Sequence, residues 1–158
     1  MKFRAPAIPL ITVDPYFSVW SPCETINFAP TEFWSGKQNS VLGVVYIDGE
    51  RYTFLGYHRD YKKLTQKEIS YDAFSTTVTF ENEKICLKAI FTSPLLLNDY
   101  NILTRPVSYL NLTWYSKDSK EHQVKFDVAV SEELCLQKPW QNEVEAQETT
   151  LSNGLKGM

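Results

Sequence analysis

The chain has 158 residues, of which 43% are hydrophobic and 22% are charged, a balance that suits one folded domain over residues 1–158 with a single sizeable core. Its formal net charge is -3 and only Lys62-Lys63 hints at a basic cluster, so nucleic-acid binding is not expected. No segment reaches the roughly 20 apolar residues of a membrane span, and the N-terminus lacks the apolar core of a signal peptide.

Two short apolar runs open the chain, at residues 10–13 and 16–20, and Asp14-Pro15 joins them. Both runs are rich in β-branched and aromatic residues, which favour strands. Proline fixes φ and removes a backbone donor, so the Asp-Pro pair predicts a turn or kink. We therefore expect a kinked pair of strands whose aromatic side chains anchor the core. Asp14 is expected to accept hydrogen bonds from nearby backbone amides.

A β-hairpin is predicted around Asp48-Gly49. The segments 40–48 and 50–56 on either side are rich in β-branched and aromatic residues. A type I′ turn needs positive φ at both central residues, and Asp-Gly is among the pairs that supply it most readily.

Further strands are predicted at residues 64–71, 74–81, 84–93, 107–116 and 122–130. Alternation places one apolar face on each of the last three: Ile85, Leu87, Ala89 and Phe91; Leu110, Leu112 and Trp114; and Val124, Phe126, Val128 and Val130. Residues 94–106 are expected to form a crossover loop, and residues 117–121 a charged turn.

These elements predict an all-β fold, an antiparallel β-sandwich with long loops and little or no helix. No amphipathic stretch of convincing helical length is present. Residues 143–158 are polar and contain no expected closing strand.

No catalytic or cofactor motif stands out in the sequence. Serine-nucleophile and glycine-rich phosphate motifs are absent. Cys23, Cys86 and Cys135 lie far apart without metal-ligand spacing, so no metal and no cofactor are expected, while one disulfide stays possible. Cys86 is expected to be a small buried hydrophobe.

Two places are candidates for binding or chemistry. His58, Arg59 and Asp60 lie in a polar aromatic loop that either covers the surface or lines a groove. Trp34, beside Gly36, and Trp140, beside Pro139, are candidates for sugar stacking or for packing against a loop or neighbouring domain. His122, in a charged turn, is expected to be a solvated surface histidine.

Several segments resemble the N-terminal region of the glutaminase A family. They are residues 5–10 (APAIPL), 13–21 (VDPYFSVWS), 33–37 (FWSGK), 91–96 (FTSPLL) and 103–110 (LTRPVSYL), in the family's order. Residues 33–37 are similar to a segment that reads HWTGK in the family, and Phe33 stands where the family has histidine.

The resemblance implies an N-terminal β-sandwich region followed by a C-terminal α-helical toroid, in enzymes that hydrolyse L-glutamine to glutamate and ammonia. It also implies a periplasmic or extracellular location. The architecture is similar to that of glycoside hydrolases with an (α/α) barrel. No catalytic residue is carried over, because none of the matched segments holds a catalytic motif.

Three functional hypotheses follow. The first is a non-catalytic N-terminal domain that packs against a helical catalytic domain outside this chain and shapes its substrate entrance. The second is a carbohydrate-binding module, or an accessory domain of a glycoside hydrolase-like enzyme, that uses Trp34 or Trp140. The third is a catalytic domain centred on His58, Arg59 and Asp60. A small molecule or a glycan is the expected ligand.

Overall fold

The computed structural model describes residues 5–136, 144–145, 147–150, 152, 154 and 156–157. Its strands are β1 (Ile8–Asp14), β2 (Phe17–Ser21), β3 (Val41–Ile47), β4 (Glu50–Leu55), β5 (Lys62–Lys63), β6 (Thr65–Tyr71), β7 (Ser75–Glu81), β8 (Ile85–Thr92), β9 (Tyr109–Ser116), β10 (Val124–Val130), β11 (Thr149–Thr150) and β12 (Lys156–Gly157). The helical pieces are α1 (Tyr100–Leu103) and the 3-10 helix η1 (Glu132–Leu134).

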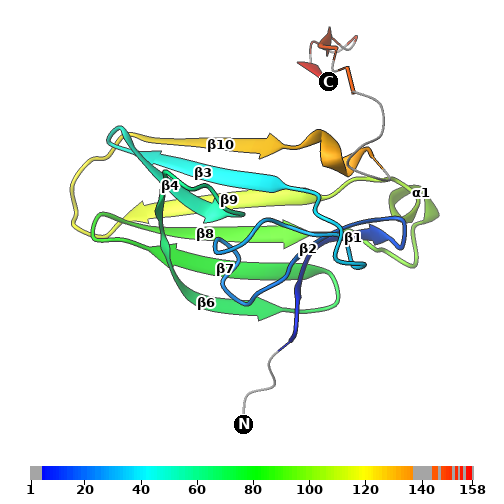
Figure 1. Cartoon of the computed structure of the whole chain (residues 1–158), viewed down its shortest axis with the longest axis horizontal. Coiled ribbons are helices and arrows are strands. Elements are labelled where there is room, and N and C mark those ends of the chain that lie inside the picture. Colours follow the sequence, from blue (N-terminus) through cyan, green and yellow to red (C-terminus); the bar gives the residue numbers. More distant parts are fainter. Residues whose placement is uncertain are drawn as a thin grey trace.

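Two four-stranded sheets pack face to face, which confirms the predicted all-β sandwich (Figure 1). One sheet has the strand order β10-β3-β4-β5, and the other has β6-β7-β8-β9. All neighbouring strands pair antiparallel except β4 and β5, which form a short parallel pair. Strands β1 and β2 form a separate antiparallel pair at the end of the sandwich where α1 lies (Figure 1).

The turn between β1 and β2 forms as predicted. The Asp14 carboxylate accepts hydrogen bonds from the backbone N–H of Tyr16, at 2.7 Å, and of Phe17, at 3.0 Å. These bonds satisfy two amides that the kink at Pro15 takes out of the strand ladder.

The expected role of the aromatic residues in this pair is wrong. Tyr16 is 94% exposed, and the core receives Ile8, Leu10 and Val19 instead. Tyr16 lies in the turn rather than in β2, so the strand alternation that buries Val19 does not reach it.

The Asp48-Gly49 hairpin joins β3 and β4 as predicted. Both turn residues have positive φ, 52° for Asp48 and 85° for Gly49, as a type I′ turn requires. On its other side β3 pairs with β10 along the whole of both strands, from Ile47 with Val124 to Val41 with Val130.

The predicted crossover at residues 94–106 is wrong. Strands β8 and β9 are hydrogen-bonded neighbours, so this loop returns the chain to the same sheet, with α1 inside it. The chain changes sheet between β9 and β10 instead, through residues 117–123, because β10 pairs with β3 in the other sheet.

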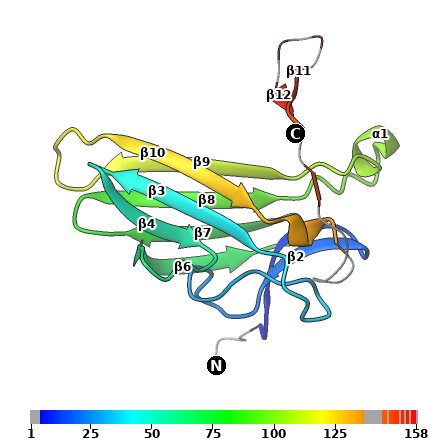
Figure 2. The same cartoon turned by 45° about the horizontal axis from the view of Figure 1, so that its top comes forward.

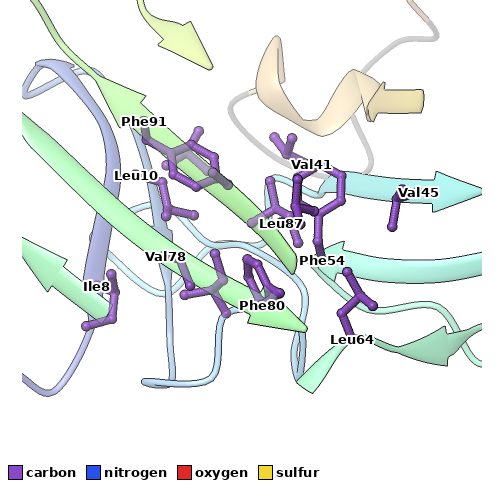
Figure 3. Close-up of a cluster of buried hydrophobic side chains, with 14 of the residues drawn as sticks. Ile8, Leu10, Val41, Val45, Phe54, Leu64, Val78, Phe80, Leu87 and Phe91 are labelled. Atoms are coloured by element: carbon purple, nitrogen blue, oxygen red, sulfur yellow. The ribbon is translucent and has the colours of Figure 1, made fainter. Parts of the chain in front are cut away.

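The core lies between the two sheets and includes Ile85, Leu87, Ala89 and Phe91, the face predicted for β8. Figure 3 shows Leu87 and Phe91 within this cluster. The Phe54 ring packs edge-on against Phe80 and Phe126, with ring centroids 6.4 and 6.3 Å apart. Aromatic pairs prefer this edge-to-face geometry, and the contact between Phe54 on β4 and Phe80 on β7 links the two sheets.

The side chains of β9 and β10 are less buried than those of the inner strands. Trp114, predicted as a core residue, is exposed, and Leu110 and Leu112 are only partly buried. Val128 and Val130, on the predicted inner face of β10, are 48% and 58% exposed. Within the described part of the chain both strands are the outermost of their sheets, so each has a neighbour on one side only.

Candidate functional site

The exposed aromatic residues at the β1–β2 end of the sandwich form the best candidate site. Residues 33–37, which we call the Trp34 turn, are closed by hydrogen bonds from Phe33 N to Lys37 O, at 2.7 Å, and from Gly36 N to Phe33 O, at 2.9 Å. Gly36 has a φ of +82°, which favours glycine. The turn leaves the Trp34 side chain 66% exposed.

The Trp34 turn is tied to the turn between β1 and β2. The Trp34 indole Nε1 donates a hydrogen bond to the backbone oxygen of Pro15, at 2.9 Å. Two of the segments that resemble the glutaminase A family therefore meet in space, and the bond holds the indole with part of its surface in solvent. Tyr16 lies next to this contact along the chain and exposes its ring.

A hollow of about 460 Å³, which we call the Asn39 hollow, opens beside the two turns. It is lined by Tyr16, Phe17, Ser18, Phe33, Ser35, Lys37, Asn39 and residues 133–136. The wall of the hollow contains a positively charged side chain, Lys37, and a negatively charged one, Glu133. Lys37 Nζ donates to the backbone oxygen of Glu133, at 3.2 Å. The backbone N–H of Ser40 donates to the Glu133 carboxylate, at 3.0 Å, and holds the pKa of that group below its usual value.

Asn39 lines this hollow and has an unpaired acceptor atom beneath its surface. The residue is only 4% exposed, and its Nδ2 donates to the backbone oxygen of Ser18, at 2.9 Å. Its Oδ1 is buried and has no hydrogen-bond partner among the described residues. A buried acceptor without a partner costs free energy, so a hydrogen bond from an ordered water inside the wall would be favourable here.

A second hollow, of about 320 Å³, shares Phe33 with the first as a lining residue. It is lined by Pro6, Ala7, Trp20, Pro22, Glu32, Phe33, Trp34 and Gly36. Aromatic rings beside a carboxylate and backbone groups suit a polar ligand with a flat apolar face.

The structure does not bring His58, Arg59 and Asp60 to these hollows. The His58 ring stacks on Tyr61, with centroids 3.7 Å apart, and its Nδ1 accepts a hydrogen bond from the backbone N–H of Asp60, at 3.2 Å. Arg59 and Asp60 are exposed. Trp140, the other tryptophan candidate, lies outside the described residues.

A polar cluster at the opposite end of the sandwich was not predicted. His122 Nε2 lies 2.8 Å from Asp118 Oδ1, and His122 Nδ1 lies 2.9 Å from Asp48 Oδ2, which also binds Lys84 Nζ at 2.7 Å. The His122 side chain is only 5% exposed, so its prediction as a solvated surface residue is wrong. We call these four residues the His122 cluster.

The carboxylates of Asp118 and Asp48 raise the pKa of His122. In return, His122 lowers the pKa of Asp118 to about 2. Lys84, followed by His122, lowers the pKa of Asp48. Sequence spacing gave no signal of this cluster, because Asp48 is distant from His122 along the chain and only the fold brings the two turns together.

Within the described part of the chain, no group of three His, Cys, Asp or Glu side chains is placed to hold a metal ion. Cys23, Cys86 and Cys135 are all free thiols, and Cys86 is buried as predicted. No helix in these residues has the length and apolar character that crossing a membrane requires.

Comparison with known proteins finds two domain-family models that match this chain and an enzyme to which it is similar. Family models described as domains of unknown function match residues 1–66 (DUF4964) and 74–157 (DUF5127). The chain is 27% identical over 139 residues to glutaminase A of Aspergillus oryzae (strain ATCC 42149 / RIB 40). That match covers 82% of this chain but 20% of the fungal protein, so the chain spans about a fifth of its relative's length. No solved structure matches.

Proposed function

The chain belongs to the DUF5127 family, and from this premise we propose that it is the non-catalytic N-terminal β-sandwich domain of a glutaminase-like protein. The extent of the likeness to glutaminase A carries the proposal, because most of this chain corresponds to only a fifth of that protein. The hydrolytic groups then belong to the remaining polypeptide, which the family resemblance expects to be α-helical. The sandwich packs against that polypeptide.

The proposed role includes shaping the substrate entrance. The Trp34 turn and the Asn39 hollow support this role, since they combine exposed aromatic rings with Lys37 and Glu133 at one end of the sandwich. Such a surface can guide a small polar substrate without reacting with it.

The first experiment measures ammonia release from L-glutamine by the isolated chain, with the fungal glutaminase A as the positive control. We expect no release above the buffer rate. Turnover that copurifies with the folded chain would refute the non-catalytic assignment.

The second experiment tests the entrance in the full-length protein that contains this chain. Trp34→Ala should raise KM for the substrate severalfold and leave kcat unchanged, because the proposed indole contact binds the substrate equally in the ground state and the transition state. Leu97→Ala is the matched control, since Leu97 is also exposed but lies outside both hollows. Equal KM values for all three proteins would remove the entrance role.

Carbohydrate binding is a second candidate function, favoured by the exposure of the Trp34 indole beside two hollows. Affinity-gel electrophoresis in soluble polysaccharides should then retard the chain, and Trp34→Ala should abolish the retardation while Tyr71→Ala keeps it. Migration that no polysaccharide changes would exclude this candidate.

A further inference from the structure

The margin of the sandwich where β9 and β10 end their sheets is open and apolar. Figures 1 and 2 show both strands along the same margin. A groove of about 230 Å³ lies there, which we call the β9–β10 groove. It is lined by Leu10, Ile11, Phe17, Val19, Val41, Leu55, Phe91, Ser108, Tyr109, Leu110, Val128, Val130 and Leu134, so apart from Ser108 its walls are apolar or aromatic.

The exposed apolar side chains of this groove follow the alternation of a buried strand. Val128 and Val130 occupy the same face of β10 as Phe126, which packs against Phe54 in the core. Tyr109 is also exposed at the start of β9. Soluble proteins seldom leave a contiguous apolar patch uncovered unless it binds something. The pattern is that of a core position, and no element among the described residues covers it.

Both strands that flank the groove have a free backbone edge. Strand β10 pairs with β3, and β9 pairs with β8, and neither has a second neighbour among the described residues. An unpaired strand edge offers a row of N–H and C=O groups to an added strand.

One polar side chain, Ser108, belongs to the lining of the groove. The Ser108 hydroxyl is buried and has no hydrogen-bond partner among the described residues. Because this oxygen is enclosed, the apolar side chains of the lining, and not the Ser108 hydroxyl, would meet an occupant of the groove.

We propose that an extended segment of the polypeptide downstream of this chain adds to β10 as a strand and inserts apolar side chains into the β9–β10 groove. The inference rests on the proposed function, because the related glutaminase A is about five times as long as the region that this chain matches. The β10 edge is the docking edge, since Val128 and Val130 are more exposed than Leu110 on β9.

Hydrogen exchange of backbone amides tests this proposal by comparing the isolated chain with the full-length protein. We expect peptides that cover Val124–Val130 to exchange at least about tenfold more slowly in the full-length protein, because an added strand protects the free edge. Strand β6, the opposite edge of the other sheet, should keep its exchange rate and is the matched control.

Paired substitutions on β10 sharpen the test. Val130→Asp places a charge in the groove, whereas Ala129→Asp places one on the other face of the same strand. In the full-length protein, Val130→Asp should cancel the protection of β10 and Ala129→Asp should retain it. Both positions are exposed in the isolated chain, so both variants should fold.

The outcomes separate this inference from the proposed function. Protection of other surfaces with β10 unprotected would overturn the inference and leave an accessory domain that packs elsewhere. No protection anywhere, or a reading frame that stops at residue 158, would overturn both. A dimer of the isolated chain that Val130→Asp disrupts would assign the groove to a second copy and overturn the inference alone.

Discussion

His122 shows how a single residue makes the fold depend on pH. Its two ring nitrogens face the carboxylates of Asp118 and Asp48, which favours the doubly protonated, charged ring. Folding raises the pKa of His122 above that of an unfolded histidine, about 6.5. The stabilisation is therefore complete below pH about 6.5 and is lost as the pH rises through the higher folded value.

We predict that the urea midpoint of the chain is higher at pH 6 than at pH 8.5, and that His122→Gln lowers the midpoint at pH 6 and abolishes the difference. The second histidine of the chain supplies the control, since His58→Gln should keep the pH dependence. A difference that survives in His122→Gln would show that other groups cause it.

The two carboxylates act in the opposite direction. Folding lowers the pKa of both Asp48 and Asp118, so their contribution is complete above the unfolded aspartate value, about 3.9, and is lost as the pH falls through the folded values. The His122 cluster thus stabilises the fold most between about pH 4 and pH 6.5.

At the residue scale, a side chain's role was predictable from the sequence where it forms hydrogen bonds to residues next to it in the chain. Asp14 caps the backbone two and three residues on, and such bonds are visible in a local pattern. His122 bonds across the fold to Asp48, and Trp34 to Pro15, so neither partner was predictable.

At the scale of elements, strand β3 carries a glycine that its packing requires. A Cβ at Gly43 would lie 2.5 Å from Cζ and 2.6 Å from Cε2 of the Phe54 ring, and 2.9 Å from Cβ of Leu55. Because Gly43 has no side chain, β3 leaves room for the Phe54 ring, which packs against residues of both sheets.

We predict that Gly43→Ala destabilises the chain by about 1–3 kcal/mol, the range for overpacking a core, as measured by urea unfolding. Phe54→Leu removes the ring atoms that clash. The cost of Gly43→Ala should therefore be smaller in a Phe54→Leu background, and equal costs in both backgrounds would contradict the proposed clash.

The positions of the strands were predictable from the sequence, but the sheet to which each strand belongs was not. Alternation and the Asp48-Gly49 turn located the main strands, because these signals are local. The long loop after β8 looked like a crossover from its length, yet the short charged segment after β9 makes the crossing. Strand partners depend on which apolar faces meet across the fold, and one strand's pattern does not encode that.

At the scale of the whole molecule, the two matched family segments share one sandwich. Strand β10, from the segment at 74–157, completes the sheet of β3 and β4, from the segment at 1–66. Phe54 from the first segment packs against Phe80 and Phe126 from the second. We propose that residues 1–158 fold as a single domain despite the boundary between the two family models.

We predict that fragments 1–72 and 73–158, cut between the two family matches, each lack a cooperative unfolding transition, whereas the intact chain shows one. Each fragment loses the neighbours of its apolar faces, so neither keeps a closed core. Mixing the fragments should restore the transition in part. A cooperative transition in either fragment alone would show two independent domains.

Because β3 pairs with β10, the outer edge of β3 cannot be covered until the ribosome has synthesised β10. About 80 residues separate Ile47 from its partner Val124, and a ribosome adds about 5–20 residues per second. The hairpin is finished only when Leu55 is added, so for roughly 3–14 s the nascent chain holds a complete β3–β4 hairpin whose outer edge has no partner. During translation that edge is open to chaperones and to neighbouring nascent chains, which makes the speed of elongation through residues 56–123 a determinant of yield.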